Sequence, residues 1–172
     1  MTIENGQMAP LFSLVSDEGA EVNLAELKGK YVVLYFYPKD DTPGCTIEAQ
    51  DFSKKIAEFE KLDCVILGVS RDNVVSHCKF IEKYKLSISL LADETGEVCK
   101  SYDVIQEKSM FGKKYFGIDR STFLIDKMGR VIDSWSSVKV KGHVEEVLKN
   151  LEKHIKSAWF LFVKKIKSPS LF

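Results

Sequence analysis

The chain has 172 residues, of which 45% are hydrophobic, and this is enough to form one domain with a buried core. Its 25 basic and 25 acidic residues balance, and no long basic run occurs, so nucleic acid is not an expected partner. The start of the chain, MTIENGQMAPLFSLVSDEG, is acidic and lacks the basic and apolar regions of a secretory signal, so we expect a reducing, cytoplasmic location.

The first elements along the chain are predicted to be a hairpin and a buried strand. Apolar and polar residues alternate on either side of Asp17-Glu18-Gly19, which indicates two short strands joined by a turn. A short helical turn is expected at residues 24–29. Seven consecutive apolar or aromatic residues, Tyr31–Tyr37, then predict a central strand that is buried on both faces.

Helices and strands alternate after this strand. Apolar side chains three or four residues apart predict a helix over residues 45–62, with charged side chains opposite. The segment Cys64–Ser70 predicts a second buried strand. Asp72 or Asn73 can cap a further helix that runs to about residue 85, and a short strand follows. This order is typical of repeated parallel crossovers.

The last elements are predicted to be an antiparallel hairpin and a helix. Two strands flank Lys127-Met128-Gly129, and a long helical pattern begins near His143. Together the elements predict an α/β, thioredoxin-like fold, with a mixed central sheet flanked by helices and an N-terminal β-hairpin extension. We assign residues 1–155 to this domain and residues 156–172 to a helical tail of the same domain.

The tail contains the apolar segment SAWFLFV between lysines. Seven residues are far fewer than the roughly 20 that span a bilayer, so no stable membrane insertion is expected. One interpretation is that the last helix continues and docks on the domain or covers a partner subunit. The other interpretation is a contact with a membrane surface through the aromatic and basic side chains.

Cys45 has the most informative position of the four cysteines. It follows the loop that leaves the strand Tyr31–Tyr37 and lies in the first turn of the next helix. Open sheets bind ligands beyond the carboxyl ends of parallel strands, and a helix N-terminus offers free N–H groups to an anion. A free thiol has a pKa near 8.5, so complete ionisation gains only ~10- to 30-fold in thiolate. Other groups must therefore orient a substrate and stabilise its charge.

Three residues around this thiol are candidates for that task. The hydroxyl of Thr42, three residues before Cys45, can bond to a substrate oxygen. Pro38 stiffens the loop and can exclude water. Arg120 opens a strand that is expected to neighbour Tyr31–Tyr37, where a permanently charged guanidinium would contact both thiolate and substrate.

The segment PKDDTPGC, with Pro38, Thr42 and Cys45, resembles the Pro-x-x-x-Thr-x-x-Cys signature of peroxiredoxins. The wider segments YFYPKDDTPGCTIEAQDF, LGVSRD, FIEKYKLSISLLADE and FGIDRSTFLID are similar to the branch of the bacterioferritin comigratory protein, or peroxiredoxin Q. The resemblance extends over roughly residues 9–151.

This resemblance implies a thioredoxin-dependent peroxidase with no cofactor and no metal. Cys45 would attack hydrogen peroxide or an organic hydroperoxide and become a sulfenic acid. Thr42, Arg120 and the backbone N–H groups of Gly44 and Cys45 would bind the peroxide, and Pro38 would shield the thiol. Thioredoxin, glutaredoxin or a small thiol would restore the enzyme, as a monomer or weak homodimer.

The sequence departs from the family at the resolving cysteine. Many relatives have a second cysteine five residues after the first, where this chain has Gln50. Cys78 stands on the helix where some relatives place this residue, although its spacing from Val74 and Ile81 makes core packing the default expectation and a resolving role the alternative. A disulfide needs Cα atoms within about 7 Å, so pairing with Cys45 would require unwinding of the first helical turn.

The remaining reactive side chains have simpler explanations. Cys64 and Cys99 are expected to be buried structural residues. His77, His143 and His154 are scattered and are expected to be core or surface residues, and Arg71 is expected at a strand end, outside the site.

Two other functions are considered. A thioredoxin-type disulfide reductase is disfavoured because no second cysteine stands at the CxxC position after Cys45. A non-enzymatic binding or holdase module, using the aromatic tail, is the alternative.

Overall fold

A computed structural model of the chain describes residues 2–168. Its helices are α1 (Pro43–Lys61), α2 (Val74–Tyr84), α3 (Glu97–Ser101) and α4 (His143–Lys167), with a 3-10 turn at Leu24–Leu27. Its strands are β1 (Ser13–Ser16), β2 (Glu21–Asn23), β3 (Tyr31–Phe36), β4 (Cys64–Ser70), β5 (Ser89–Ala92), β6 (Ile105–Met110), β7 (Lys113–Ile118), β8 (Ser121–Ile125) and β9 (Val131–Trp135).

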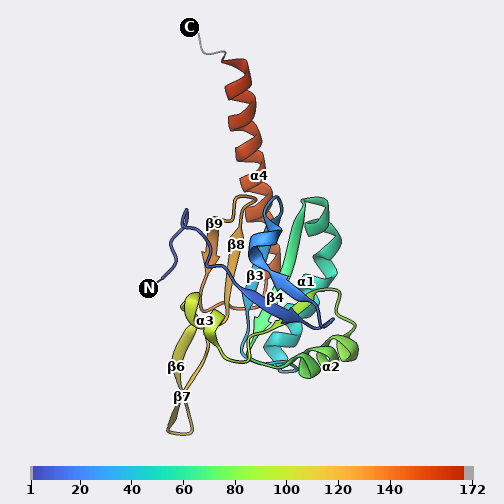
Figure 1. Cartoon of the computed structure of the whole chain (residues 1–172), viewed down its shortest axis with the longest axis vertical. Coiled ribbons are helices and arrows are strands. Elements are labelled where there is room, and N and C mark those ends of the chain that lie inside the picture. The colour runs from blue at the N-terminus through green and yellow to red at the C-terminus, as the bar shows by residue number, and fades with distance from the viewer. Residues whose placement is uncertain (1, 169–172) are drawn as a thin grey trace.

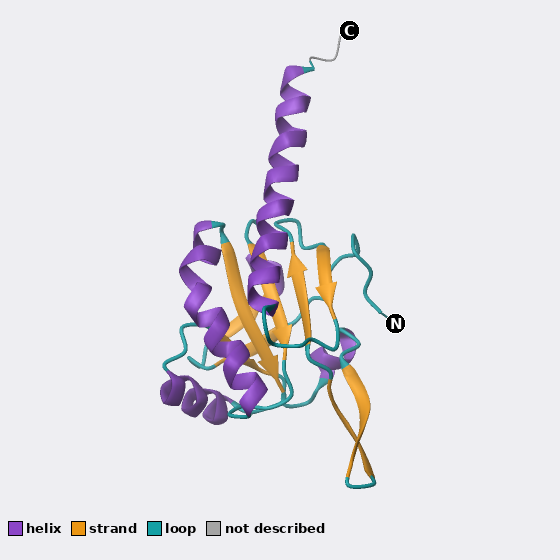
Figure 2. Ribbon diagram, turned by 180° about the vertical axis from the view of Figure 1, so that it is seen from behind, coloured by secondary structure: helices purple, strands orange, loops and turns teal. Residues whose placement is uncertain are grey.

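Seven strands form one mixed sheet in the order β2-β1-β5-β4-β3-β8-β9. The strands β3, β4 and β5 are parallel, whereas β1 and β8 pair antiparallel with β5 and β3. Figure 2 shows α1 and α4 side by side on one face of this sheet. The predicted α/β, thioredoxin-like fold is confirmed, and the N-terminal hairpin extends the sheet through β1.

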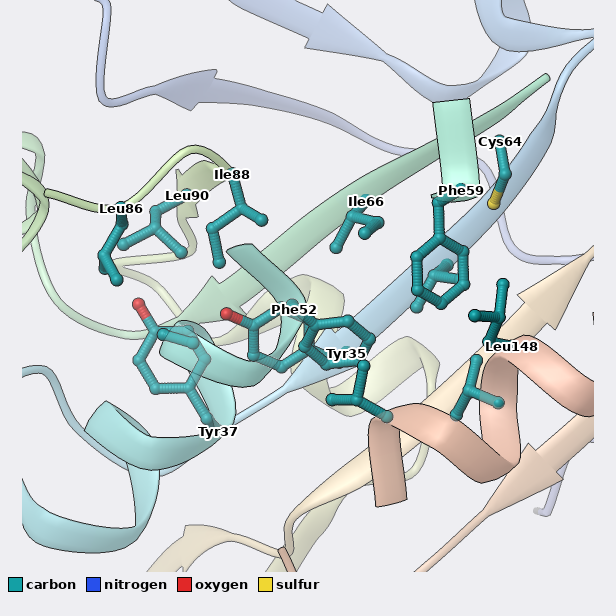
Figure 3. Packing of buried hydrophobic residues seen from close by; sticks show 14 of the residues in the cluster. Tyr35, Tyr37, Phe52, Phe59, Cys64, Ile66, Leu86, Ile88, Leu90 and Leu148 are labelled. Atoms are coloured by element: carbon teal, nitrogen blue, oxygen red, sulfur yellow. The ribbon is translucent and has the colours of Figure 1, made fainter. Parts of the chain in front are cut away.

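Every residue of β3 is buried because the two faces of the sheet contact different halves of the core. Tyr31, Val33 and Tyr35 point toward α1 and α4, while Val32 and Leu34 point toward the opposite face. Figure 3 shows the first of these clusters, in which Tyr35 stacks on Phe52 of α1 with ring centroids 4.6 Å apart. This packing fixes α1 against the strand that precedes it.

One hairpin was not predicted from the sequence. The strands β6 and β7 form a separate two-stranded sheet that extends away from the body (Figure 1). Its turn is Phe111-Gly112, with φ of +51° and +77°. Two-residue hairpin turns often have positive φ at both residues, and in a sequence they are usually recognised by Asn-Gly or Asp-Gly. A phenylalanine at this position gave no such signal.

The interpretation that the tail docks on its own domain is wrong. The buried residues of α4 are all between His143 and Leu151, and the helix then continues beyond the edge of the sheet (Figure 1). The expected boundary at residues 155 and 156 falls inside this continuous helix, and the last four residues of the tail lie outside the described residues. Within residues 2–168, no helix has the length and apolar character needed to cross a membrane.

Candidate active site

The pairing of β3 with β8 determines which residues meet at Cys45. The two strands are antiparallel, and Phe36 at the end of β3 lies opposite Ser121 at the start of β8. The loop after β3, which leads into α1, therefore lies beside Arg120, which directly precedes β8. Two segments that are 75 residues apart in the chain are thus brought together as the sequence predicted.

Cys45 lies in the first turn of α1 and is only 2% exposed. The Nη2 group of Arg120 donates a hydrogen bond to its Sγ atom over 3.3 Å. The helix begins at Pro43, and Thr42 makes no side-chain bond to the N–H groups of this turn. N–H groups of a first turn have no partner inside the helix, so those of Gly44 and Cys45 remain available to an anion.

Glu48 is the second partner of Arg120 and was missed by the sequence reasoning. Its Oε1 atom accepts a hydrogen bond from Arg120 Nη1 at 2.8 Å, and its side chain is 0% exposed. The sequence pattern placed Ile47 in the apolar stripe and the charged residues on the opposite side, yet Ile47 is exposed and Glu48 is buried. The sequence signal that could have identified Glu48 is its spacing from Cys45, because residues three apart share a helix face.

The burial of this ion pair affects both of its groups. Burial raises the pKa of Glu48 to about 7, although the charge and hydrogen bond of Arg120 act in the opposite direction. Burial alone would lower the pKa of Arg120, but the charges of Glu48 and Cys45 and its hydrogen bonds to both side chains raise it. The guanidinium is therefore permanently charged and is held between a carboxyl group and a sulfur atom.

Gly44 allows the guanidinium to approach the helix so closely. A Cβ atom at this position would lie 3.1 Å from Arg120 Nη2, which is tighter than ordinary van der Waals contact. A Cβ atom at position 44 would therefore require the guanidinium to shift by a few tenths of an ångström.

Thr42 and Pro38 lie on the loop before the helix. The hydroxyl of Thr42 donates to the backbone carbonyl of Lys39 over 2.7 Å. Because a carbonyl can only accept, the hydroxyl hydrogen is committed to it and the lone pairs of Thr42 remain as acceptors. Pro38 is exposed on the surface, and its role in shielding the thiol stays a prediction.

A buried polar cluster attaches this loop to α2. Asp40 Oδ2 lies 2.7 Å from His77 Nδ1, while His77 Nε2 lies 2.9 Å from the carbonyl of Leu91. Both partners act as acceptors when Asp40 is ionised, and this arrangement favours a hydrogen on each ring nitrogen, which is the charged form of the imidazole. Burial alone would lower the pKa of His77, but the hydrogen bond and charge of Asp40 raise it.

The next residue of the loop makes a second attachment to the same helix. Asp41 accepts hydrogen bonds from Lys83 Nζ at 2.8 Å and from the hydroxyl of Tyr84 at 2.6 Å. The loop that carries Thr42 is therefore fixed to both ends of α2, which limits its movement relative to the sheet.

The expectation that Cys78 packs in the core is wrong. Its side chain is exposed, and its Sγ atom donates to the carbonyl of Asp17 over 3.0 Å. Asp17 belongs to the turn after β1, and β1 is three strands away from β3 in the sheet. The Cys78 thiol thus bonds to the turn after β1 rather than to Cys45, so a disulfide between the two cysteines would need a local rearrangement.

The other two cysteines are buried, as expected. Burial raises the pKa of Cys64 to about 12 and raises the pKa of Cys99 as well, with Asp93 adding to the shift at Cys99. Both thiols are therefore protonated at neutral pH and unreactive.

The remaining histidines and Arg71 contact residues other than Cys45. His143 is buried against Thr122, with 2.8 Å between its Nε2 atom and the hydroxyl, and burial together with Arg120 lowers its pKa to about 4. The ring of His154 packs edge-on against Tyr31. Arg71 lies beside Gly96, at the start of α3. Within residues 2–168, no three histidine, cysteine or acidic side chains are grouped for metal binding.

Comparisons with known proteins identify a family and relatives that this chain is similar to. A model described as the AhpC/TSA family matches residues 5–134. Peroxiredoxin Bcp of Bacillus subtilis is 54% identical over 152 residues, which cover 88% of this chain and 97% of that protein. A putative peroxiredoxin bcp of Coxiella burnetii is 52% identical, over 88% of this chain and 100% of that protein.

Solved structures of peroxiredoxins are also similar to this chain, in both fold and sequence. Peroxiredoxin Q of Xanthomonas campestris has a TM-score of 0.80 at 45% identity, covering 83% of this chain and 90% of that one. A mutant PrxQ of Xylella fastidiosa has a TM-score of 0.86 at 38% identity, covering 90% and 99%. A further structure, of the Xanthomonas campestris bacterioferritin comigratory protein, concerns alkyl peroxide reduction and has a TM-score of 0.80 at 44% identity, covering 83% and 91%.

Proposed function

This chain belongs to the AhpC/TSA family, among its peroxiredoxins of the Bcp type, and we propose that it reduces hydrogen peroxide and alkyl hydroperoxides with Cys45 as the attacking thiol. The observation that carries this assignment is the 3.3 Å contact between Arg120 Nη2 and Cys45 Sγ at the start of α1. A helix N-terminus and a guanidinium both favour an anion at this sulfur, and the thiolate is the nucleophilic form of cysteine.

The reaction transfers one oxygen atom to the sulfur. The thiolate of Cys45 attacks the terminal oxygen of R–O–O–H, an S–O bond forms, and the O–O bond breaks. The electron pair of that bond leaves with R–O⁻, which takes up a proton to give an alcohol, or water when R is hydrogen. The sulfur loses two electrons and becomes a sulfenic acid.

The groups around Cys45 can orient the peroxide and stabilise charge in the transition state, which ionisation of the thiol alone does not do. Negative charge moves from sulfur to the leaving oxygen, and Arg120 with the N–H groups of Gly44 and Cys45 can stabilise this charge on both atoms. The free lone pairs of Thr42 can accept a hydrogen bond from the peroxide O–H, which would orient the substrate. With Cys45 only 2% exposed, a narrow –OOH end fits this approach better than a bulky group.

Glu48 acts through Arg120 rather than on the substrate. Its Oε1 atom holds Nη1, which leaves Nη2 of the same planar group directed at the sulfur. A guanidinium with its plane fixed in this way needs little rearrangement when the transition state forms. We therefore propose Glu48 as a positioning residue for Arg120.

An external thiol is the proposed reductant of the sulfenic acid. Thioredoxin, glutaredoxin or a small thiol can fill this role, and the protein would act in a cytoplasmic compartment as a monomer or weak homodimer. The hydrogen bond of Cys78 to the Asp17 carbonyl argues against a direct disulfide with Cys45 in the folded state. Cys78 remains a resolving cysteine only if α1 or α2 unfolds locally after oxidation.

Peroxide consumption in the presence of thioredoxin and its reductase tests this function. The parent protein should consume peroxide, and Cys45→Ser should not, whereas Cys99→Ser, a change at a buried thiol, serves as the matched control. A Cys45→Ser protein that keeps the parent rate contradicts the assignment. Intact mass after one equivalent of peroxide distinguishes the recycling routes, because a disulfide loses two hydrogen atoms and a sulfenic acid gains one oxygen.

A further inference from the structure

The end of α4 carries an apolar surface that no other described part of the chain covers. Trp159, Phe162 and Ile166 are 65%, 55% and 64% exposed. Their spacing of three, four and seven residues places them on one face of the helix. The rings of Trp159 and Phe162 confirm this, since they contact each other with centroids 5.9 Å apart.

This surface continues the stripe that attaches α4 to the domain. Val144, Val147, Leu148 and Leu151 are buried in the core, and Ile155 packs against its edge. The helix then runs through residues 157–167, about 16 Å at 1.5 Å per residue, away from the sheet (Figure 1). The apolar face is therefore presented to the surroundings on a rigid support.

Lysines surround the apolar face. Residues 153–167 contain five lysines and no acidic residue, and the last acidic residue of the chain is Glu152. Helical periodicity places Lys156 and Lys167 along one side of the face and Lys165 along the other. Such lysines can rest their apolar stems beside a hydrophobic layer while their ammonium groups stay among polar groups.

We propose that this segment, residues 153–167, binds flat on the surface of a bilayer that contains anionic phospholipids. An amphipathic helix with Trp and Phe on one face and lysines around it is the type that lies in the interface between headgroups and acyl chains. The segment is too short to span a bilayer of roughly 30 Å. The lysines would pair with the negatively charged headgroups.

The same charges oppose pairing with the corresponding helix of a second copy. Two such helices lying against each other would bring ten lysines together without one acidic partner in residues 153–167. Like charges at these distances are unfavourable. Charge complementarity therefore favours an anionic surface over a second tail. This proposal does not depend on the peroxidase function.

Phe160 provides an internal control for the orientation. It is as exposed as Phe162, at 61%, but it lies on a different face, where Lys164 Nζ is 5.0 Å from its ring centroid. A helix that binds through Trp159 and Phe162 buries Phe162 and leaves Phe160 outside the bilayer.

Co-sedimentation of the full chain with lipid vesicles tests the proposal. We expect binding to vesicles of phosphatidylcholine with phosphatidylglycerol, weaker binding as salt is added, and little binding to phosphatidylcholine alone. Phe162→Ala should lower the partition coefficient about tenfold or more, the scale expected for one buried aromatic side chain, while Phe160→Ala stays within about twofold.

Three results would overturn the proposal. The first is no binding to anionic vesicles, and the second is equal binding to neutral and anionic vesicles. The third is an equal loss in Phe160→Ala and Phe162→Ala, because it would mean that no particular face is used. Analytical ultracentrifugation of the same proteins measures whether the apolar face instead joins two copies of the chain in a dimer. A dimer that Phe162→Ala dissociates, together with no vesicle binding, would assign the face to a second copy instead.

Discussion

The substitution Glu48→Gln tests the buried ion pair beneath the reactive sulfur. It keeps the shape of the side chain and an oxygen that can accept from Arg120 Nη1, but it removes the ionisable group. Burial raises the pKa of Glu48 from 4.5 to about 7, in spite of Arg120. A raised pKa means that the folded protein favours the protonated carboxyl group more than the unfolded chain does.

The sign of the pH effect follows from this shift. Glu48 contributes stability that is fully present below pH 4.5 and is lost as the pH rises through about 7. The shift corresponds to about 3 kcal/mol, at roughly 1.4 kcal/mol per pKa unit. Between about pH 4 and pH 8, the unfolding free energy of the parent protein should therefore fall by ~3 kcal/mol more than that of Glu48→Gln.

Urea unfolding at a series of pH values measures this difference. The other titrating groups are the same in both proteins, so the comparison isolates position 48. Glu58→Gln on the same helix is the matched control, because Glu58 forms only an exposed pair with Lys55 and should follow the parent. Parallel stability curves for the parent and Glu48→Gln would refute the reasoning.

The same variant should also react about tenfold more slowly with peroxide, because a neutral acceptor holds the guanidinium less strongly than a carboxylate does. Stopped-flow kinetics at pH 8 would measure this loss, and an unchanged rate constant would show that Arg120 needs no carboxylate to hold it.

Substitutions at three further positions test other contacts. Gly44→Ala should displace the guanidinium of Arg120, since the new Cβ would lie 3.1 Å from Nη2. Peroxide reduction should then be about tenfold slower with little effect on stability, and a parent-like rate would contradict this. Thr42→Val should lose activity while Thr42→Ser keeps most of it, because only the hydroxyl can accept from the peroxide; equal activities would exclude that hydrogen bond. Tyr35→Phe should be stabilising by about 1 kcal/mol in urea unfolding, since it removes a buried hydroxyl that has no hydrogen-bond partner among residues 2–168, and a destabilised variant would reveal a partner.

The sequence was sufficient to predict that Arg120 and Cys45 meet, because the order of the strands determines this contact. The apolar run at Tyr31–Tyr37 indicated a central strand, and Arg120 opens a strand expected beside it. Antiparallel pairing of these two strands then necessarily brings Arg120 to the start of the next helix. The contact between Arg120 and Cys45 required no knowledge of side-chain packing.

Residues whose burial contradicts their polarity could not be predicted in this way. Glu48 and His77 are both fully buried, and hydropathy assigns such side chains to the surface. Each has a partner from a distant segment: Asp40 lies 2.7 Å from His77, and Arg120 donates to Oε1 of Glu48, although within residues 2–168 the Oε2 atom of Glu48 has no hydrogen-bond partner. The reverse error occurred at Cys78, whose helical spacing suggested the core although the thiol lies at the surface.

The position of the first oxidation distinguishes an activated thiol at Cys45 from a thiol that reacts only because it is exposed. The fully reduced protein is treated with one equivalent of hydrogen peroxide, and peptide mass spectrometry after trapping of sulfenic acid locates the added oxygen. We expect the added oxygen on Cys45 in the parent protein, and we expect Arg120→Met to react far more slowly at the same cysteine. Oxidation that begins at the exposed Cys78, at a rate independent of Arg120, would contradict this expectation.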